Sequence, residues 1–179
     1  EIPVIHEDDF LNPAGKLPGA MDFMVGNPPW ANRGPEKGLH HQFARRIPTH
    51  LKTDGVASVL LPSKTFLNEK TNVFQLEWLQ EIRLEEVVQL ADYSKILFAE
   101  AKCPCMIVRF RNDPLVDSHD RVEYVAPKLT CASAREGLIT VAPTDRKSIS
   151  LQRLLHAAKH KTAPTVWKKH LWGSPRDIK

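Results

Sequence analysis

Short apolar runs alternate with helical spacings over the first two thirds of the chain. The runs at 22–26, 56–61, 84–91 and 105–110 favour strands, and the continuous apolarity of 56–61 is typical of a strand buried on both faces of a parallel sheet. Apolar positions spaced about four residues apart predict helices over 39–52, with a kink at Pro48, and over 71–82. Asp54-Gly55 predicts a turn between the first helix and the second strand.

This order of elements predicts the fold class. Strand, helix, strand, helix, strand, strand is typical of an α/β protein with a doubly wound, mostly parallel sheet and a closing antiparallel hairpin. We expect all four strands in one sheet, the first two parallel and the last one antiparallel. Asn27 is then expected at the carboxyl end of the first strand.

The pattern changes after Asn112, and we place a soft boundary near residue 115. Runs at 122–125 and 138–141 predict isolated strands, and Ser148 is a candidate cap for a helix that reaches about His160. Prolines and glycines among residues 164–175 predict irregular structure. The interpretation is one partial domain at 1–115 and an extension at 116–179, the possible start of a DNA-recognition region.

Charge is distributed unevenly along the 179 residues. The net charge is +4, but residues 146–179 contain nine Lys or Arg and one acid, Asp177. A basic extension of this kind suits contact with a phosphate backbone or forms a solvated surface, and the sequence leaves both open. No apolar run approaches the roughly 20 residues of a membrane span, so we expect no membrane partner.

The three cysteines indicate neither a disulfide framework nor a metal site. Cys103-Pro104-Cys105 is too short for the usual metal-binding spacing, and there is no second pair. We interpret both as small apolar residues of a strand. Reduced thiols favour the cytoplasm.

The tetrapeptide Asn27-Pro28-Pro29-Trp30 is the one strong chemical signal. Two prolines fix the backbone and remove two amide donors, so the carbonyls of the turn can accept hydrogen bonds from a ligand. The Asn27 amide oxygen and the Pro28 carbonyl then form two neighbouring acceptors beside an aromatic plane. These groups suit an exocyclic amine on a flat base. When the two acceptors bind the amine hydrogens, the nitrogen lone pair becomes more localised and can attack a methyl group. The alternative is a structural turn with Trp30 in the core.

This motif resembles the catalytic motif of the N6-adenine DNA methyltransferases of bacterial restriction–modification systems. Further stretches also resemble segments of that family, namely residues 6–11, 55–63 and 76–83. Residues 96–98 and 106–110 resemble its closing hairpin. The resemblance covers roughly residues 5–112, and 171–177 is weakly similar to a segment of large enzymes of this kind.

The resemblance implies S-adenosylmethionine as cofactor and double-stranded DNA with a flipped adenine as partner. It implies catalytic roles for Asn27, Pro28, Pro29 and Trp30, and cofactor contacts from Asp9, Phe10 and Asn27. It also implies that Phe98 and Trp30 hold the extruded base.

One departure concerns the cofactor. The family binds it through a Gly-rich turn after its first strand, yet this chain has eight glycines and no Gly-x-Gly. Since the chain also begins at Glu1, we expect a fragment, the catalytic half, whose partner is the missing N-terminal half of the same domain. Alone it is expected to be inactive and to bind the cofactor weakly. Methylation of RNA or protein glutamine, and a non-catalytic DNA-binding fragment, stay open as alternatives.

Overall fold

A computed structural model describes residues 7–12, 20–30, 38–98, 103–114, 117 and 119–173. Its strands are β1 (Met21–Gly26), β2 (Leu51–Pro62), β3 (Arg83–Gln89), β4 (Cys105–Arg111), β5 (Arg121–Val125) and β6 (Arg146–Ser150). Its helices are α1 (Leu39–Arg46), α2 (Lys64–Leu67), α3 (Asn72–Glu81), α4 (Ser94–Leu97), α5 (Cys131–Glu136), α6 (Leu151–Lys159) and α7 (Ala163–Trp172). Short 3-10 turns are η1 (Ile47–His50), η2 (Glu69–Thr71), η3 (Ala91–Tyr93) and η4 (Pro143–Asp145).

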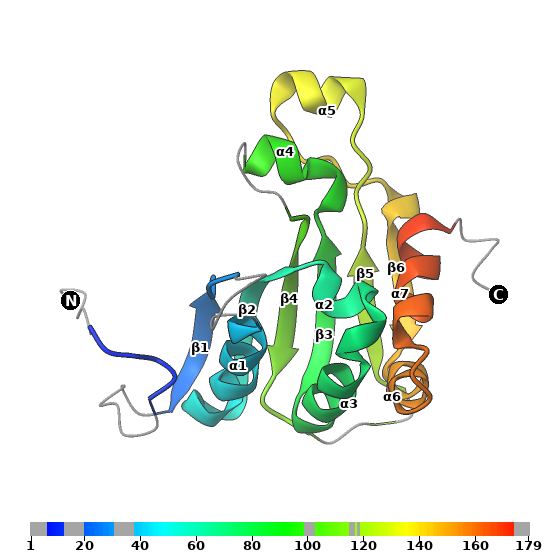
Figure 1. The fold of residues 1–179 in the computed structure, drawn as a ribbon. Coiled ribbons are helices and arrows are strands. Elements are labelled where there is room, and N and C mark those ends of the chain that lie inside the picture. The colour runs from blue at the N-terminus through cyan, green and yellow to red at the C-terminus, as the bar shows by residue number, and fades with distance from the viewer. Residues whose placement is uncertain are drawn as a thin grey trace.

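In the described residues the strands form one sheet in the order β1-β2-β4-β3-β5-β6 (Figure 1). β1 pairs parallel with β2 and β3 pairs parallel with β5, while β4 is antiparallel to both β2 and β3. Four strands therefore run in one direction, and β3–β4 is the antiparallel hairpin. The predicted fold class, the four strands and their directions are confirmed.

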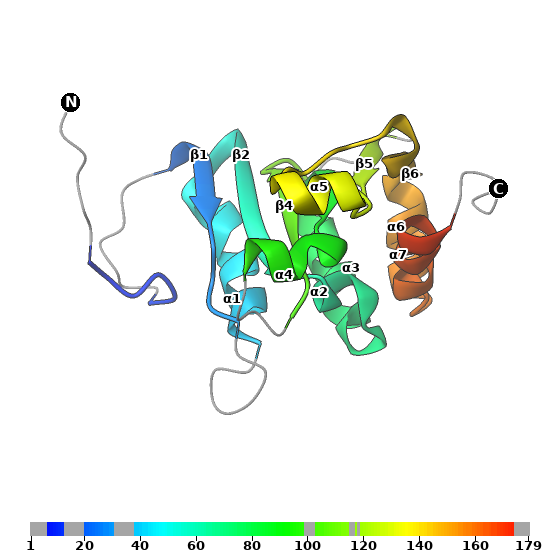
Figure 2. The same cartoon turned by 90° about the horizontal axis from the view of Figure 1, so that it is seen from above.

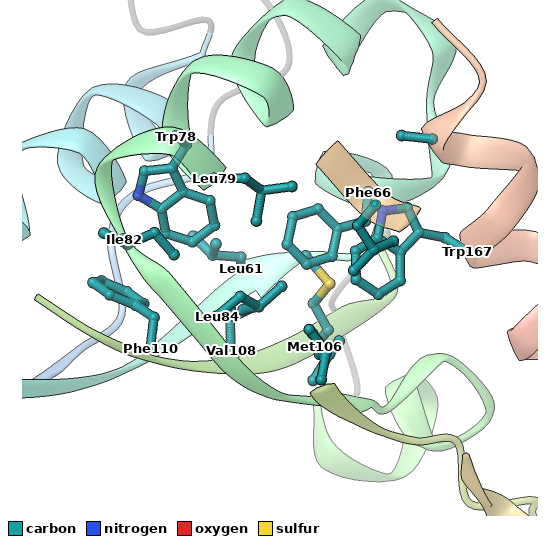
Figure 3. Packing of buried hydrophobic residues seen from close by; sticks show 14 of the residues in the cluster. Leu61, Phe66, Trp78, Leu79, Ile82, Leu84, Met106, Val108, Phe110 and Trp167 are labelled. Atoms are coloured by element: carbon teal, nitrogen blue, oxygen red, sulfur yellow. The ribbon is translucent and has the colours of Figure 1, made fainter. Parts of the chain in front are cut away.

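The described helices α1, α3, α6 and α7 gather on one face of the sheet (Figure 2). Alternate residues of each strand point into the core beneath them, as Val59 and Leu61 do on β2 and Val108 and Phe110 do on β4. Figure 3 shows these side chains meeting large aromatics from the helices. Phe66 stacks on Trp167 with ring centroids 4.5 Å apart, and Trp78 donates from Nε1 to the Ala44 carbonyl.

The other face of the sheet is exposed at β1. Phe23 is 58% exposed and Val25 is 75% exposed, whereas Met24 between them packs against the core. β1 is also the edge strand, so its outer side has no strand neighbour among the described residues. The architecture is thus a sheet with helices on one side and an apolar, uncovered corner on the other.

Two expectations about the first half are corrected. The predicted helix over 39–52 ends earlier, because Pro48 opens the 3-10 turn η1 and Leu51 already pairs with Met21. Asp54 and Gly55 form an irregularity within β2 rather than a turn before it. Asp54 has a φ of 63°, and a Cβ on Gly55 would lie 2.9 Å from the Met21 carbonyl oxygen.

Ile96 and Leu97 lie in helix α4 rather than in a strand, so the strand that pairs with β4 in the hairpin is β3. The reason is the antiparallel β3–β4 register, which matches Arg83 through Gln89 with Arg111 through Met106 and leaves α4 to the connection. The α4 segment rises with α5 beyond the end of the sheet (Figure 1).

The residues after 115 contain more helix and strand than their sequence predicts. Val122–Val125 forms part of β5, and is not isolated, since β5 pairs with β3 and β6. Residues 138–141 form no strand; they are exposed and follow Gly137, which ends α5 in a left-handed conformation. The helix cap is Ser150 rather than Ser148, because β6 continues to Ser150.

Residues 163–172 form helix α7 instead of irregular structure, because a proline in the first turn of a helix loses no hydrogen bond. The elements after residue 115 share the sheet and the core of those before it.

Candidate active site

The carboxyl end of β1 presents the motif. Asn27 follows Gly26 directly and is exposed, Pro28 is buried, and Trp30 is half-buried. Because β1 and β2 run parallel, their carboxyl ends meet at the same edge of the sheet, where ligands of open α/β sheets bind. Asn27 therefore stands where the sequence placed it, with its side chain at the surface.

Trp30 is held from two sides. Its Nε1 donates to the Leu60 carbonyl at 3.4 Å, which ties the indole to β2. Phe98, after α4, meets the indole edge-on, with ring centroids 6.5 Å apart and an interplanar angle of 73°. The structure thus brings together the two aromatic residues predicted to hold a base, although they are 68 positions apart in the sequence.

Two cavities flank Asn27. One, of about 260 Å³, lies on the helix side and is lined by Phe10, Phe43, Ile47 and residues 24–29. The other, of about 400 Å³, lies on the opposite side and is lined by residues 25–27, Ser58, Leu60 and Ile107. Asn27 is among the residues common to both, so a ligand in either cavity would lie against the start of the motif.

The segment 7–12 is anchored next to the helix-side cavity. Phe10 stacks on Phe43 at 5.3 Å between ring centroids, and Arg46 donates to the carbonyls of Phe10 and Asn12 at 2.8 and 3.0 Å. The exposed Asp9 carboxylate accepts from the Leu11 amide at 2.9 Å. Phe10 lies in the wall of the cavity and Asp9 beside it. His6, the first residue of this predicted segment, lies outside the described residues.

Sequence reasoning missed Arg46 and the carbonyl of Leu60. In the sequence Arg46 is indistinguishable from any cation in the last turn of a helix, and Leu60 accepts the hydrogen bond from Trp30 through its backbone carbonyl. Neither has a signal in the sequence.

Two adjacent histidines, His40 and the half-buried His41, lie in the first turn of α1, shortly after the motif. His40 is buried, His41 stacks on Phe74 with centroids 4.1 Å apart, and the two rings lie 4.1 Å from each other. Burial lowers the pKa of both from 6.5 to about 4, and the charge of Lys64 adds to the effect. Both rings are therefore neutral at pH 7.

Within the described residues no group of three or more His, Cys, Asp or Glu side chains is placed to hold a metal ion. The rings of His156 and His160 lie with their centroids 4.2 Å apart and their planes tilted by 33°, and both residues are exposed. Likewise, no helix in this part of the chain has the length and apolarity needed to cross a membrane.

Solved structures share this fold. No protein family profile matches the chain, and no curated protein does. The M protein of the type I restriction enzyme EcoKI matches with a TM-score of 0.59 at 12% identity, over 88% of this chain and 45% of that one. A methyltransferase subunit of a type I restriction–modification system from Streptococcus thermophilus matches with a TM-score of 0.50 at 16% identity, over 87% and 36%.

A chain from a structure of a type I restriction–modification complex matches with a TM-score of 0.59 at 14% identity, over 88% of this chain and 38% of that one. These likenesses show the fold, which a putative class I S-adenosylmethionine-dependent methyltransferase from Listeria monocytogenes also shares, with a TM-score of 0.53 at 13% identity over 83% of this chain and 45% of that one. The chain spans less than half the length of these structures.

Proposed function

We propose that this chain is the catalytic half of an enzyme that transfers a methyl group from S-adenosylmethionine to the exocyclic N6 of a flipped-out adenine in DNA, as part of a restriction–modification or related system. The observation that carries the proposal is the position of Asn27-Pro28-Pro29-Trp30 at the carboxyl end of β1, between two cavities. The fold shared with type I modification subunits supports the system.

The residues of the motif have two kinds of role, as hydrogen-bond acceptors and as aromatic surfaces. Asn27 supplies a side-chain oxygen and Pro28 a backbone oxygen, and both accept hydrogen bonds from the amine as it becomes tetrahedral. The nitrogen forms a bond to the methyl carbon as the bond between that carbon and the sulfonium sulfur breaks, which leaves a neutral thioether, and the nitrogen then releases a proton to water. Pro29 keeps the turn rigid, and Trp30 with Phe98 receives the extruded base.

The cofactor, when bound, supplies an electrophilic methyl group. The helix-side cavity suits part of it, because Phe10 and Phe43 offer aromatic walls beside Asn27. Asp9 would accept hydrogen bonds at the same wall. These residues form one side of a site only, which supports weak binding and little activity for this chain alone.

We assign the rest of that site to the other half of the domain. The uncovered apolar corner at Phe23 and Val25 and the open edge of β1 are the surfaces such a half would cover. The short coverage of the similar structures supports the same arrangement.

The identity of the product tests the proposal. The complete enzyme is incubated with DNA and isotopically labelled S-adenosylmethionine, and the digested nucleosides are separated by mass spectrometry. We expect label in N6-methyladenine. Label confined to methylated cytosine, to RNA or to protein glutamine contradicts the proposal and identifies the alternative substrate.

A further inference from the structure

A lysine-lined groove opens at the same edge of the sheet as the motif. It has a volume of about 590 Å³ and begins at Ser63, directly after β2, the parallel neighbour of β1. Lys64, Lys70, Lys168 and Trp172 are among the residues that line it. We call these four residues and the space between them the lysine groove. The groove and Asn27 therefore lie at the same edge of the sheet, where the carboxyl ends of β1 and β2 meet.

The three lysines converge from separate elements. Lys64 comes from α2, Lys70 from η2 and Lys168 from α7, which is about a hundred residues further along the chain. Within the described part of the chain none of the three forms an ion pair with a carboxylate.

Two acids also line the groove, Glu69 and Asp92, and Asp92 faces Lys128 at 3.9 Å. The groove therefore presents positive charge that its own acids do not neutralise.

Trp172 gives the groove an aromatic face. Its side chain is 69% exposed, whereas Trp167, one and a half turns earlier on α7, is fully buried and donates from Nε1 to Gln75 at 2.9 Å. Leu67 and Leu171 add apolar surface nearby. Exposing an indole to water is unfavourable unless a partner covers it. Cations along a groove with an aromatic ring at its edge are the combination that holds single-stranded nucleic acid.

We propose that the lysine groove binds the DNA strand that carries the extruded adenine, with the lysines on its phosphates and Trp172 stacked on a neighbouring base. The inference rests on the proposed function, because it takes DNA as the substrate. A base can leave the duplex only if its strand is held in a distorted path, and the groove would supply that hold at the sheet edge that also carries the catalytic motif.

Salt-dependent binding tests the groove. Fluorescence anisotropy with the full-length protein and a labelled single-stranded DNA gives the affinity over a range of salt concentrations. We expect Lys64→Gln/Lys168→Gln to weaken binding and to flatten the slope of log K against log salt by about 1.4, since each contact to a single strand contributes about 0.7. Trp172→Ala should weaken binding about 5- to 150-fold with the slope unchanged, and Trp172→Phe should retain most of it.

The matched control is Lys159→Gln/Lys161→Gln, which removes the same charge from exposed positions outside the groove. It should leave the slope near the wild-type value. Equal slopes for the groove variant and this control overturn the inference, as does tighter binding of an RNA of the same sequence. If the wild-type enzyme yields N6-methyladenine while the salt slopes of the groove variant and the control are equal, the assignment of the groove is wrong and the proposed function stands. A flattened slope without methylation supports the groove and contradicts the function.

Discussion

Residues 27–30 combine a rigid backbone with exposed acceptors. Pro28 is buried and fixes the turn, while Asn27 next to it stays at the surface between two cavities. Residues 27–30 lie outside any helix or strand, and we expect their carbonyls to be available to a ligand. A change of the exposed Asn27 is therefore expected to alter chemistry more than stability.

Trp30 is expected to act through its ring face. Trp30→Ala removes the stacking surface and the edge contact with Phe98, and should cost about 1–3 kcal/mol of DNA binding as well as rate. Trp30→Phe keeps a ring but loses the hydrogen bond to Leu60, and should retain much of both. Equilibrium titration with a duplex and single-turnover methylation measure the two effects. Equal behaviour of the Ala and Phe variants would show that the ring does not hold the base.

At the scale of elements, helix α7 belongs to the core. Trp167 packs between Phe66 and Tyr124, so Trp167→Ala should lower the free energy of unfolding by about 3–5 kcal/mol. Trp172→Ala, five residues later and exposed, should change it by less than about 0.5 kcal/mol. Urea unfolding followed by circular dichroism compares them. Similar midpoints for both variants would mean that α7 is not packed as described.

The start of α1 should make stability depend on pH. In the unfolded chain His40 and His41 have a pKa of about 6.5, whereas in the folded chain their pKa is lowered to about 4. Their contribution is thus complete above pH 6.5 and is lost as the pH falls toward 4. Urea midpoints between these pH values should fall less steeply for His40→Gln/His41→Gln than for the wild type. The exposed pair His156→Gln/His160→Gln serves as control, and the same slope for both double variants would contradict the assignment.

The elements that the sequence predicts well are those whose apolar residues form a local run or a helical spacing. The four strands before residue 115 follow from local apolar runs, and α3 follows from its spacing. The wrong predictions depend on where a proline or glycine lies within an element. Pro164 lies in the first turn of helix α7, where it does not break the helix, and Gly137 ends α5 just before residues 138–141, which form no strand. The position of Asn27 at a strand end was predictable, whereas its partners Leu60 and Arg46 depend on tertiary packing.

At the scale of the whole molecule, the helices α1, α3, α6 and α7 of the described residues cover one face of the sheet (Figure 2). The exposed apolar corner of β1 suits burial by the other half of a methyltransferase domain. In the complete enzyme Phe23→Ala should therefore lower the free energy of unfolding by about 3–5 kcal/mol, the usual cost for a buried phenylalanine. Val73→Ala, on the exposed side of α3, should change it by less than about 0.5 kcal/mol. A negligible effect of Phe23→Ala would mean that this face stays open to water.

The most direct test of the account is the Asn27→Ala enzyme. Losing one preorganised acceptor should reduce single-turnover methylation of adenine about 10²–10³-fold, while the affinity for S-adenosylmethionine hardly changes, because most of that site lies elsewhere. Circular dichroism should match the wild type, since Asn27 is exposed. If Asn27→Ala methylates DNA at the wild-type rate, the motif is a structural turn and its catalytic assignment is wrong.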